Sequence, residues 1–394
     1  MSEVQDSQIP EEQKSFEADS DDLEESPGFQ ESPNQELEET AQLVQFQSAR
    51  GEPKPQHKEW YEREPTWKWQ STELPDAFEK EKIRLLAVTW NMHGKPSPNT
   101  LHDILRPDIP HHMYVICAQE CMRSIGSSLI FKSKKEWEFK VSRTLGENYF
   151  VVESGSVGAT HLIVFAHKSL EKLIGFVEHD TVATGVGNIV SNKGGIGISF
   201  KLGHTKLMVV GVHLAAGQKN SKKRTEDWLR IEKQLGIPCY YPKAGLASDR
   251  VDAALLLGDL NYRINGSREA VELLIREEVM QPLKNGEQLS KEIQNGFFSR
   301  YKEGSLDFVP TYRFDVGTLT YDSSKKQRIP AWTDRILYKD PEGVLSQQSY
   351  DSVIHNTESD HKPVFSQFKL KFVTHYHPQD TIGKTKKSKA CQLF

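Results

Sequence analysis

The sequence has few cysteines and no long apolar run. Only four of its 394 residues are cysteine, and they form no paired Cys-x-x-Cys sets. This argues against a zinc site and gives no reason to expect a disulfide framework, so we expect a reducing, cytosolic compartment. No apolar stretch approaches the roughly 18–20 residues that a membrane-spanning helix needs.

The N-terminus also lacks the apolar segment of a secretory signal, because it is acidic and polar. Residues 1–50 hold 14 acidic residues against two basic ones, Lys14 and Arg50, a net charge of −12. Since the whole chain carries −5, residues 51–394 carry +7. This part of the chain suits an anionic substrate, although charge alone does not separate a phosphoinositide from a nucleic acid.

Composition divides the chain into three regions. Residues 1–75 are rich in Glu, Gln, Ser and Pro, which predicts a disordered acidic region. Within it, residues 43–46 are either a small docking element or a stray apolar cluster, and three tryptophans are expected on the edge of the following domain: Trp60, Trp67 and Trp69. We expect one large domain over residues 76–374 and a basic tail over residues 375–394.

The central region alternates short apolar runs with helical stretches. Strands are expected at Ile83–Trp90, Tyr114–Ala118, His161–Ala166, Gly195–Leu202, Leu207–Leu214, Ala253–Leu257, Ile336–Tyr338 and Val364–Phe372. Residues 133–136 have capping-box spacing and should open a helix whose buried face carries Trp137, Val141 and Leu145. Two further helices are expected over residues 223–235 and 267–279. This pattern predicts a single layered α/β domain.

Polar side chains end five of these runs. Leu255–Leu257 is predicted to be buried on both faces, and Asp259 and Asn261 follow at alternate positions, where they would point the same way. A turn is the alternative interpretation there, because Asp, Asn and Gly commonly form turns. The other four ends carry Asn91, Glu120, His213, and Asp360 with His361.

Each of these residues also has a purely structural interpretation. His213 can be a core histidine, Glu120 a helix cap, Asp360 an Asx turn, and Asn91 a turn residue before Gly94. Taken together, however, they are the side chains that a hard divalent cation, a general base and phosphoryl-oxygen donors require. The combination therefore favours a catalytic site.

Eight motifs between about Ile83 and Phe372 match one family. They are Trp90–Gly94, Gln119-Glu120, Ser191–Gly195, His213–Ala216, Gly258–Arg263, Pro310–Arg313, Pro330–Ile336 and Ser359–Val364. With these motifs the chain resembles the inositol polyphosphate 5-phosphatases of the Mg²⁺-dependent endonuclease/exonuclease/phosphatase superfamily. The resemblance implies a four-layer αββα sandwich, with two packed mixed β-sheets flanked by helices, and makes residues 76–374 the catalytic domain.

The resemblance also implies roles for the polar strand ends. Glu120 would bind Mg²⁺ with Asn91 close by, and Asp259 would orient and deprotonate the attacking water. Asn261 and His213 would hold phosphoryl oxygens. His361 would stabilise the pentacovalent charge, with its ring oriented by Asp334 and with Asp360 beside it. Catalysis would then be positioning plus electrostatic stabilisation, without a covalent phosphoenzyme.

Substrate choice is expected to depend on basic motifs. By resemblance, Lys193, Tyr312, Arg313 and Arg335 would bind the neighbouring ring phosphate, and Arg328 is a further candidate. For Arg335 an ion pair with Asp334 is the alternative. The chain departs from the family pattern at Thr333, where Cys is usual, and at Arg313, where Lys is common. Neither change is expected to touch the chemistry, although Arg313 could alter the phosphate preference.

The last four residues fit a prenylation pattern. Cys391-Gln392-Leu393-Phe394 is a C-a-a-X sequence, and its terminal Phe favours geranylgeranyl. Four lysines lie just upstream: Lys384, Lys386, Lys387 and Lys389. A lipid plus a basic patch makes a stable anchor, so we expect a peripheral protein on the cytosolic face of a membrane. An unmodified, disordered basic tail is the alternative.

The leading hypothesis is a Mg²⁺-dependent phosphatase that removes the 5-phosphate of PI(4,5)P2 and/or PI(3,4,5)P3, with soluble inositol polyphosphates as further substrates. No nucleic acid partner is expected, and an unidentified protein partner would bind the N-terminal segment. Two alternatives are a nuclease of the same superfamily and a non-catalytic, membrane-tethered adaptor that binds phosphoinositides.

Overall fold

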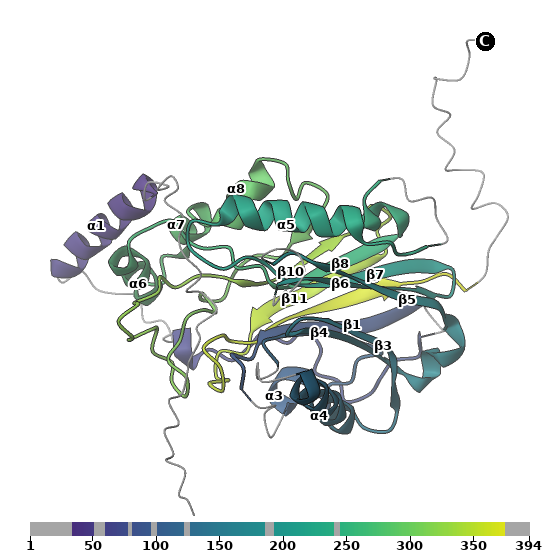
Figure 1. The fold of residues 1–394 in the computed structure, drawn as a ribbon. Helices are drawn as coiled ribbons and strands as arrows, with labels where there is room; N and C mark the ends of the chain where they lie inside the picture. The colour runs from purple at the N-terminus through teal and green to yellow at the C-terminus, as the bar shows by residue number, and fades with distance from the viewer. Residues whose placement is uncertain are drawn as a thin grey trace, which may run out of the picture.

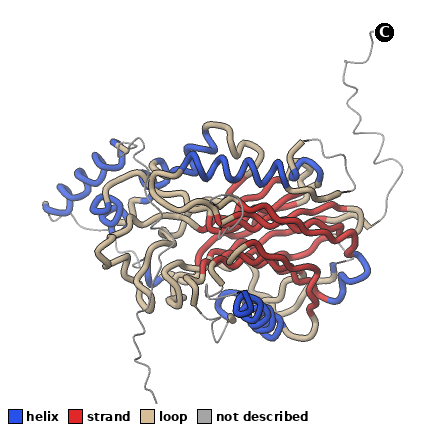
Figure 2. The backbone as a smooth tube through the Cα atoms, in the orientation of Figure 1, coloured by secondary structure: helices blue, strands red, loops and turns tan. Residues whose placement is uncertain are grey.

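The fold is described from a computed structural model. It describes residues 34–50, 60–77, 81–95, 101–121, 127–185, 193–239 and 245–374, apart from the side chains of residues 127–133. In this part of the chain two six-stranded sheets lie face to face, with helices on both outer sides (Figures 1 and 2). This is the predicted α/β sandwich of two packed mixed sheets flanked by helices.

The first sheet, sheet A, has the strand order β11-β12-β1-β2-β4-β3. Its strands are β1 (Lys82–Asn91), β2 (Met113–Gln119), β3 (Tyr149–Val157), β4 (Thr160–His167), β11 (Leu345–Ser352) and β12 (Val364–Lys371). Strands β1 and β2 run parallel and the other neighbours antiparallel.

The second sheet, sheet B, has the order β5-β6-β7-β8-β10-β9. Its strands are β5 (Ile174–Ala183), β6 (Gly194–Leu202), β7 (Thr205–His213), β8 (Ala253–Asp259), β9 (Lys302–Glu303) and β10 (Asp334–Lys339). Here β7 and β8 form the parallel pair. Each sheet therefore has one parallel pair near its centre.

Helices cover the two outer faces. Helices α3 (His102–Leu105) and α4 (Ser127–Leu145) lie against sheet A, and α5 (Ser221–Gln234) lies against sheet B (Figure 1). The other α-helices of the described residues are α1 (Gln35–Ala49), α6 (Arg268–Arg276), α7 (Met280–Asn285) and α8 (Gln288–Gln294). Short 3-10 turns cover Trp60–Glu62, Lys168–Leu173 and Ala247–Arg250. Within the described ranges, every helix is too short or too polar to cross a bilayer.

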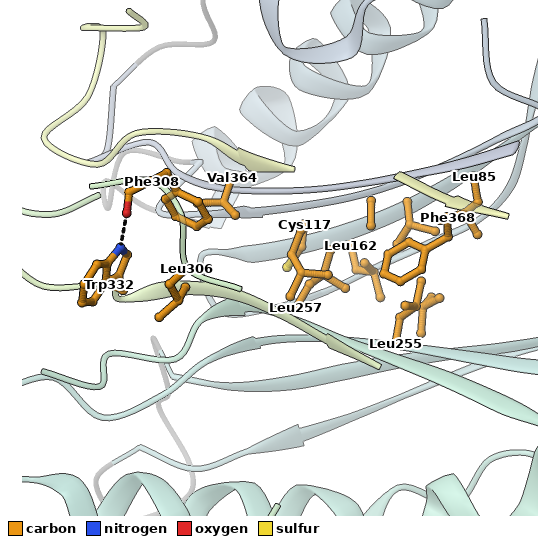
Figure 3. Close-up of a cluster of buried hydrophobic side chains, with 14 of the residues drawn as sticks. Leu85, Cys117, Leu162, Leu255, Leu257, Leu306, Phe308, Trp332, Val364 and Phe368 are labelled. Atoms are coloured by element: carbon orange, nitrogen blue, oxygen red, sulfur yellow. Dashed lines mark hydrogen bonds between the residues drawn. The ribbon is translucent and has the colours of Figure 1, made fainter. Parts of the chain in front are cut away.

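Three clusters of buried apolar side chains fill the interfaces between the layers. The largest lies between the sheets, where Leu85 and Leu162 of sheet A face Leu255 and Leu257 of sheet B (Figure 3). A second joins sheet A to Trp137 and Val141 of α4 and to the residues around α3, and a third joins sheet B to α5. Because both faces of the inner strands are covered, their sequences are continuous apolar runs. Each fully buried Leu contributes about 1.5–3 kcal/mol to folding.

All eight predicted strands are present, with ends shifted by a few residues. The helix predicted from Ser133 begins earlier, at Ser127, but Trp137, Val141 and Leu145 do form its buried face. The helices predicted over 223–235 and 267–279 correspond to α5 and α6. Strands β3, β5, β9 and β11 were not predicted, and they are the four edge strands of the two sheets.

The prediction that residues 1–75 are disordered is wrong for the part that the structure describes. Residues 35–49 form α1, which begins with Asn34 as its N-cap and buries Leu37 and Ala41. Leu37 packs against Gly266 and Gly286, where an added Cβ would lie 2.8 and 3.2 Å from the leucine. Scattered apolar residues are sufficient here because α1 buries one narrow face against an existing domain.

Residues 60–77 run over the outside of the domain. The ring of Trp67 stacks on Phe365 of β12 with centroids 3.8 Å apart, and Trp69 packs edge-on against His111. The backbone N–H of Lys68 donates to Gln367 Oε1 at 2.7 Å. Trp60 contacts the Phe314 and Tyr321 rings, so all three tryptophans pack on the domain as predicted. The predicted tail, residues 375–394 with Cys391, lies outside the described residues.

Candidate active site

Strand direction brings the polar strand ends of sheet B together. Since β7 and β8 are parallel, His213 and Asp259 end them side by side as register partners. Strand β10 runs the other way and begins with Asp334, the partner of Asp259 across the ladder. The three side chains His213, Asp259 and Asp334 therefore form a row at one edge of sheet B.

The facing edge of sheet A carries the other predicted residues. Asn91 and Gln119 end the parallel strands β1 and β2 as partners, and Glu120 follows directly. The segment 359–361 precedes β12 and is held at the same edge, because Ser359 Oγ donates to the Asn91 carbonyl at 2.7 Å. Asn91 Nδ2 then donates to Asp259 Oδ2 at 3.0 Å and joins the two sheets across the site.

Backbone conformation at this edge is unusual in two ways. A Cβ on Gly258 would lie 2.0 Å from the Val212 carbonyl oxygen, so only glycine allows β7 and β8 to approach this closely just before Asp259. Glu120 and Asn261 have positive φ values of 48° and 58°, which is uncommon for residues other than glycine and concentrates at functional sites. Both follow a strand directly or within two residues.

Asp259 and Asn261 are buried and in contact. The Asn261 backbone N–H donates to Asp259 Oδ1 at 3.0 Å, so the segment is a turn as well as part of the site. Burial alone would raise the pKa of Asp259, but His213, His361 and Lys193 outweigh burial and hold that pKa well below its usual value. Asp259 is therefore a carboxylate at neutral pH, with one oxygen held by Asn91 and the other by the Asn261 backbone.

His361 is paired with Asp334 as expected. Its Nδ1 lies 2.8 Å from Asp334 Oδ2, and the hydroxyls of Thr311 and Thr333 donate to the same oxygen at 2.9 Å. Burial would lower the pKa of His361, but the nearby carboxylates, led by Asp334, raise it to about 9. The imidazole is thus a cation at neutral pH. The Thr311 and Thr333 contacts were not predicted.

Thr333 requires a correction. It was expected not to touch the chemistry, yet its hydroxyl lies 2.9 Å from Asp334 Oδ2 and 3.3 Å from His361 Nδ1. The residue that departs from the family pattern therefore contacts the Asp334–His361 pair directly.

Lys193 and His213 lie on the other side of Asp259. The Nε2 atom of His213 is 2.5 Å from Lys193 Nζ, 3.2 Å from Asp259 Oδ2 and 4.0 Å from Glu120 Oε1. Lys193 therefore reaches the site, where its ammonium group can meet a phosphate. The neighbouring residues Ser191 and Asn192 of the same motif lie outside the described residues.

Asp360, Tyr312 and Arg313 line the remaining side. Asp360 Oδ2 is 3.3 Å from both Arg313 Nε and His93 Nδ1, and burial raises the pKa of Asp360. The Tyr312 ring lies 4.4 Å from the His361 ring, centroid to centroid. Arg313 is partly exposed, and its contact with Asp360 places it beside His361; its predicted phosphate contact stays a prediction.

Arg335 does not reach the site, and its predicted role in substrate binding is wrong. Its side chain is fully buried and makes a two-pronged pair with Glu303, at 2.7 and 2.6 Å, plus a 2.8 Å contact with Glu287. The alternative prediction, an ion pair with Asp334, was correct that Arg335 forms an ion pair, but the carboxylates are those of Glu303 and Glu287. Side chains alternate along β10, so Arg335 lies on the opposite face of sheet B from Asp334.

Arg328 is less closely tied to the site. It lies in the loop that follows Asp322, and its backbone N–H donates to Asp322 Oδ2 at 2.8 Å. Its predicted contact with substrate stays a prediction.

The donor set at this edge fits a hard divalent cation. Glu120 follows β2 directly and has a side chain that is 28% exposed, and Asn91 and Asp259 add oxygen ligands to this end of the site. In the described part of the chain, ligand atoms of Asp259, Asp334 and His361 also lie within 4.8 Å of one another. His361 and Asp334, however, already share a hydrogen bond, so we regard them as an ion pair and Glu120 as the main candidate ligand.

Cys117 can be dismissed as a nucleophile. With Arg123, which lies outside the described residues, it has the Cys-x5-Arg spacing of cysteine-dependent phosphatases. The thiol lies inside β2 between the sheets, fully buried, and burial raises its pKa to about 12 (Figure 3). A neutral, inaccessible thiol is not a nucleophile.

Comparison with protein families finds one matching model. Residues 88–367 match the Endonuclease/Exonuclease/phosphatase family 2. The chain is also 32% identical over 315 residues to the phosphatidylinositol polyphosphate 5-phosphatase type IV of Rattus norvegicus, covering 76% of this chain and 47% of that protein. It is 33% identical over 322 residues to the phosphatidylinositol 4,5-bisphosphate 5-phosphatase INP51 of Saccharomyces cerevisiae, covering 78% and 33%. The chain thus spans about half or less of the length of these relatives.

A solved structure matches the fold. It is the inositol polyphosphate 5-phosphatase domain of SpSynaptojanin, crystallised with inositol (1,4)-bisphosphate and a calcium ion. The two structures share 31% sequence identity and a TM-score of 0.67, covering 76% of this chain and 88% of the other. That domain has a divalent cation and an inositol phosphate bound to the same kind of sandwich.

Proposed function

The chain belongs to the inositol polyphosphate 5-phosphatase family of the endonuclease/exonuclease/phosphatase superfamily, and on this premise we propose that it is a Mg²⁺-dependent phosphoinositide 5-phosphatase. Its substrates would be PI(4,5)P2 and/or PI(3,4,5)P3, with soluble inositol polyphosphates as further substrates. Support comes from the relatives named above and from one observation on this chain: an ionised Asp259 lies in the same buried cluster as a protonated His361.

The proposed reaction is direct attack of water on the 5-phosphate. Asp259 orients the water and accepts its proton as the water oxygen bonds to phosphorus, while the bond from phosphorus to the ring oxygen breaks. Asn91 holds the Asp259 carboxylate in place from across the site. A general base fixed in this way contributes about 10²–10⁴-fold to the rate.

Several hydrogen-bond donors and cations of the chain would stabilise the negative charge that develops on the phosphoryl oxygens. His361 is cationic, and with Nδ1 engaged by Asp334 its Nε2–H is the donor that remains for an oxygen. Asn261 and His213 provide further polar contacts, and Lys193 adds positive charge. Donors that are fixed before the reaction stabilise the transition state without reorganising. Mg²⁺ held by Glu120 with Asn91 would supply Lewis-acid polarisation of the phosphate.

Recognition of inositol rings would use the second phosphate. Lys193, Tyr312 and Arg313 lie next to the reacting groups, and guanidinium and ammonium groups bind phosphates through charge-assisted hydrogen bonds. Asp360 sets the position of Arg313 through its contact with Nε. Two phosphates on neighbouring ring carbons fit this arrangement better than a single backbone phosphate of a nucleic acid.

The tail would attach the enzyme to the cytosolic face of a membrane. We propose that Cys391 is prenylated and that the nearby lysines contribute about 1 kcal/mol each at an anionic surface. Tethering raises the effective concentration of lipid substrate. Mass spectrometry of the protein from cells, and the distribution of a Cys391→Ser fusion, test this part.

A phosphate-release panel tests the central proposal. The full chain is assayed against all phosphoinositides and soluble inositol phosphates, with Mg²⁺ and with chelator. Release from 5-phosphorylated species only, and only with Mg²⁺, is expected. Faster cleavage of abasic DNA or RNA would favour a nuclease, and vesicle binding without turnover would favour an adaptor.

A further inference from the structure

Arg263 contacts Asn261 of the candidate active site, and none of the catalytic or substrate-binding roles proposed above involves it. It is 4% exposed and follows the Asp259–Asn261 turn by two residues. Its Nε donates to the Asn261 backbone carbonyl at 3.1 Å, and its Nη2 donates to Asn261 Oδ1 at 2.5 Å. One edge of the guanidinium therefore holds both oxygens of a single residue.

This contact decides which way the Asn261 amide faces. A guanidinium can only donate, so the atom of the amide that faces Arg263 must be the oxygen. The other end of the amide, Nδ2, donates to the Leu214 carbonyl at 3.2 Å, which only an N–H can do. Nδ2 carries a second N–H, which can therefore meet a phosphoryl oxygen. The reverse orientation would place a carbonyl oxygen against the anion.

The flat face of the same guanidinium supports a second part of the site. Arg263 Cζ lies 4.5 Å from the centre of the Tyr312 ring. Tyr312 also packs against His361, with the two ring centroids 4.4 Å apart and the ring planes tilted by 39°. Tyr312 thus contacts both Arg263 and His361, and cation–π attraction favours its contact with Arg263.

Arg263 is itself held firmly. Its backbone N–H donates to Gln288 Oε1 at 3.0 Å, and its carbonyl accepts from the Gln288 N–H at 2.9 Å. Arg224, also buried, donates to the same Gln288 oxygen at 2.5 Å. The backbone of Arg263 is therefore fixed to Gln288, the first residue of α8, which suits a residue that sets the position of others.

We propose that Arg263 is a positioning residue: it keeps the second Nδ2–H of the Asn261 amide toward the phosphoryl oxygens and supports Tyr312 against His361. The proposal rests on the proposed function, because the site must bind a phosphoryl group. Lysine cannot replace this arginine, since one ammonium group cannot reach both Asn261 oxygens in the planar geometry of the fork and stack on Tyr312 as well.

A double-mutant cycle separates positioning from simple stabilisation. The variants are Arg263→Lys, Asn261→Ala and the double mutant, and the matched control is Arg250→Lys. Arg250 is another buried arginine, and its donations within the described residues go to the carbonyls of Leu235, Ile237 and Gly245. Melting temperature and circular dichroism are measured for each, and kcat and KM are measured on a soluble inositol polyphosphate with Mg²⁺.

Arg263→Lys is expected to lower kcat by roughly 10- to 100-fold with little change in KM, the order of loss that follows misplacement of a reacting group. In the Asn261→Ala background the same change should lower kcat clearly less than in the wild-type background, because only the contact with Tyr312 is then left to lose. Arg250→Lys should leave kcat unchanged at a comparable loss of melting temperature. Equal losses of kcat in both backgrounds, or a loss in Arg250→Lys as large as in Arg263→Lys, would overturn the proposal.

A second measurement does not depend on activity. With ¹⁵N-labelled asparagine, the side-chain amide signals of Asn261, assigned by their loss in Asn261→Asp, should shift and exchange faster with solvent in Arg263→Lys but not in Arg250→Lys. Unchanged signals would refute the positioning role. A wild-type chain that releases no phosphate from any inositide would instead refute the proposed function and leave this test standing.

Discussion

His361 Nδ1 lies 2.8 Å from Asp334 Oδ2, and this contact joins the segment before β12 of sheet A to the first residue of β10 in sheet B. Both side chains are buried, so the pair is shielded from water. A buried imidazolium is stable only beside a carboxylate, and a buried carboxylate only beside donors. The pair is thus both a link between the two sheets and the source of the cationic imidazole in the site.

Removing either charged partner of the reaction should abolish activity. Asp259→Ala takes away the base and His361→Ala takes away the cation, and each should lower kcat by at least about 10²-fold. Phosphate release from PI(4,5)P2 vesicles and from soluble inositol polyphosphates measures this. Lys222→Ala, on the exposed surface of α5, is the control and should keep wild-type rates. Near-normal rates in both variants would refute the assignment of these residues.

The pH profile should have its basic limb near pH 9. The pKa of His361 is raised to about 9, so the active cationic form persists through neutral pH and is lost as pH rises through that value. The pKa of Asp259 is lowered, so the acidic limb lies below the ordinary range of a carboxyl. Asp334→Asn removes the largest favourable charge and should move the basic limb toward lower pH. Asp307→Asn, an exposed acid, should leave the limb in place.

The same pair should affect stability in a defined direction. Because the pKa of folded His361 lies above the usual 6.5, its pairing stabilises the fold fully below about pH 6.5 and ceases to do so as pH rises through about 9. Urea unfolding of wild type and of Asp334→Asn between pH 6 and pH 10 measures this. The stability difference between the two proteins should shrink at the alkaline end, and a difference that grows with pH would contradict the assignment.

Thr333 should matter for catalysis through its hydroxyl. Thr333→Val keeps the shape and removes the donor to Asp334, a change of about 1 kcal/mol for a buried hydrogen bond. Without this donor, Asp334 interacts more strongly with His361, so the basic limb of the pH profile should move upward. Thr333→Ser restores the hydroxyl and should restore the wild-type profile. A shift of the same size in both variants would point to packing instead.

Arg335 should contribute to stability and not to substrate binding. Arg335→Met leaves Glu303 and Glu287 buried without their partner, and breaking such a pair costs about 3–5 kcal/mol. Denaturant unfolding should show this loss, while KM of the folded protein stays near the wild-type value. The double variant Arg335→Met with Glu303→Gln should recover part of the loss. A raised KM at unchanged stability would restore the predicted substrate role.

Helix α1 should undock when its buried leucine is truncated. Leu37→Ala removes the side chain that packs on Gly266 and Gly286, a loss of about 2–5 kcal/mol for a fully buried leucine. Amide hydrogen exchange in residues 35–49 should rise strongly, as should protease cleavage there. Leu43→Ala, at a position that is 56% exposed, is the matched control and should change neither.

The four missed strands show where sequence patterns fail in this fold. Inner strands such as β8 are covered on both faces, so burial imposes a continuous apolar run that the sequence displays. Edge strands such as β5 and β11 are half exposed along most of their length and tolerate Glu, His, Gln and Ser. Their strand character depends on a neighbour in space, which a local pattern does not contain.

The sequence by itself determined the α/β class, the inner strands and most of the residues that meet at the site. A strand buried on both faces is a continuous apolar run, and the polar residue that ends it, such as Asp259 or His213, is visible in the sequence. Only the tertiary structure decided partners: Arg335 with Glu303 instead of a phosphate, Thr333 on Asp334, and Arg263 on Asn261. Hydrogen bonds and ion pairs join groups far apart in the chain. Which donor meets which acceptor is set by how the two sheets and their loops pack, and no local spacing records it.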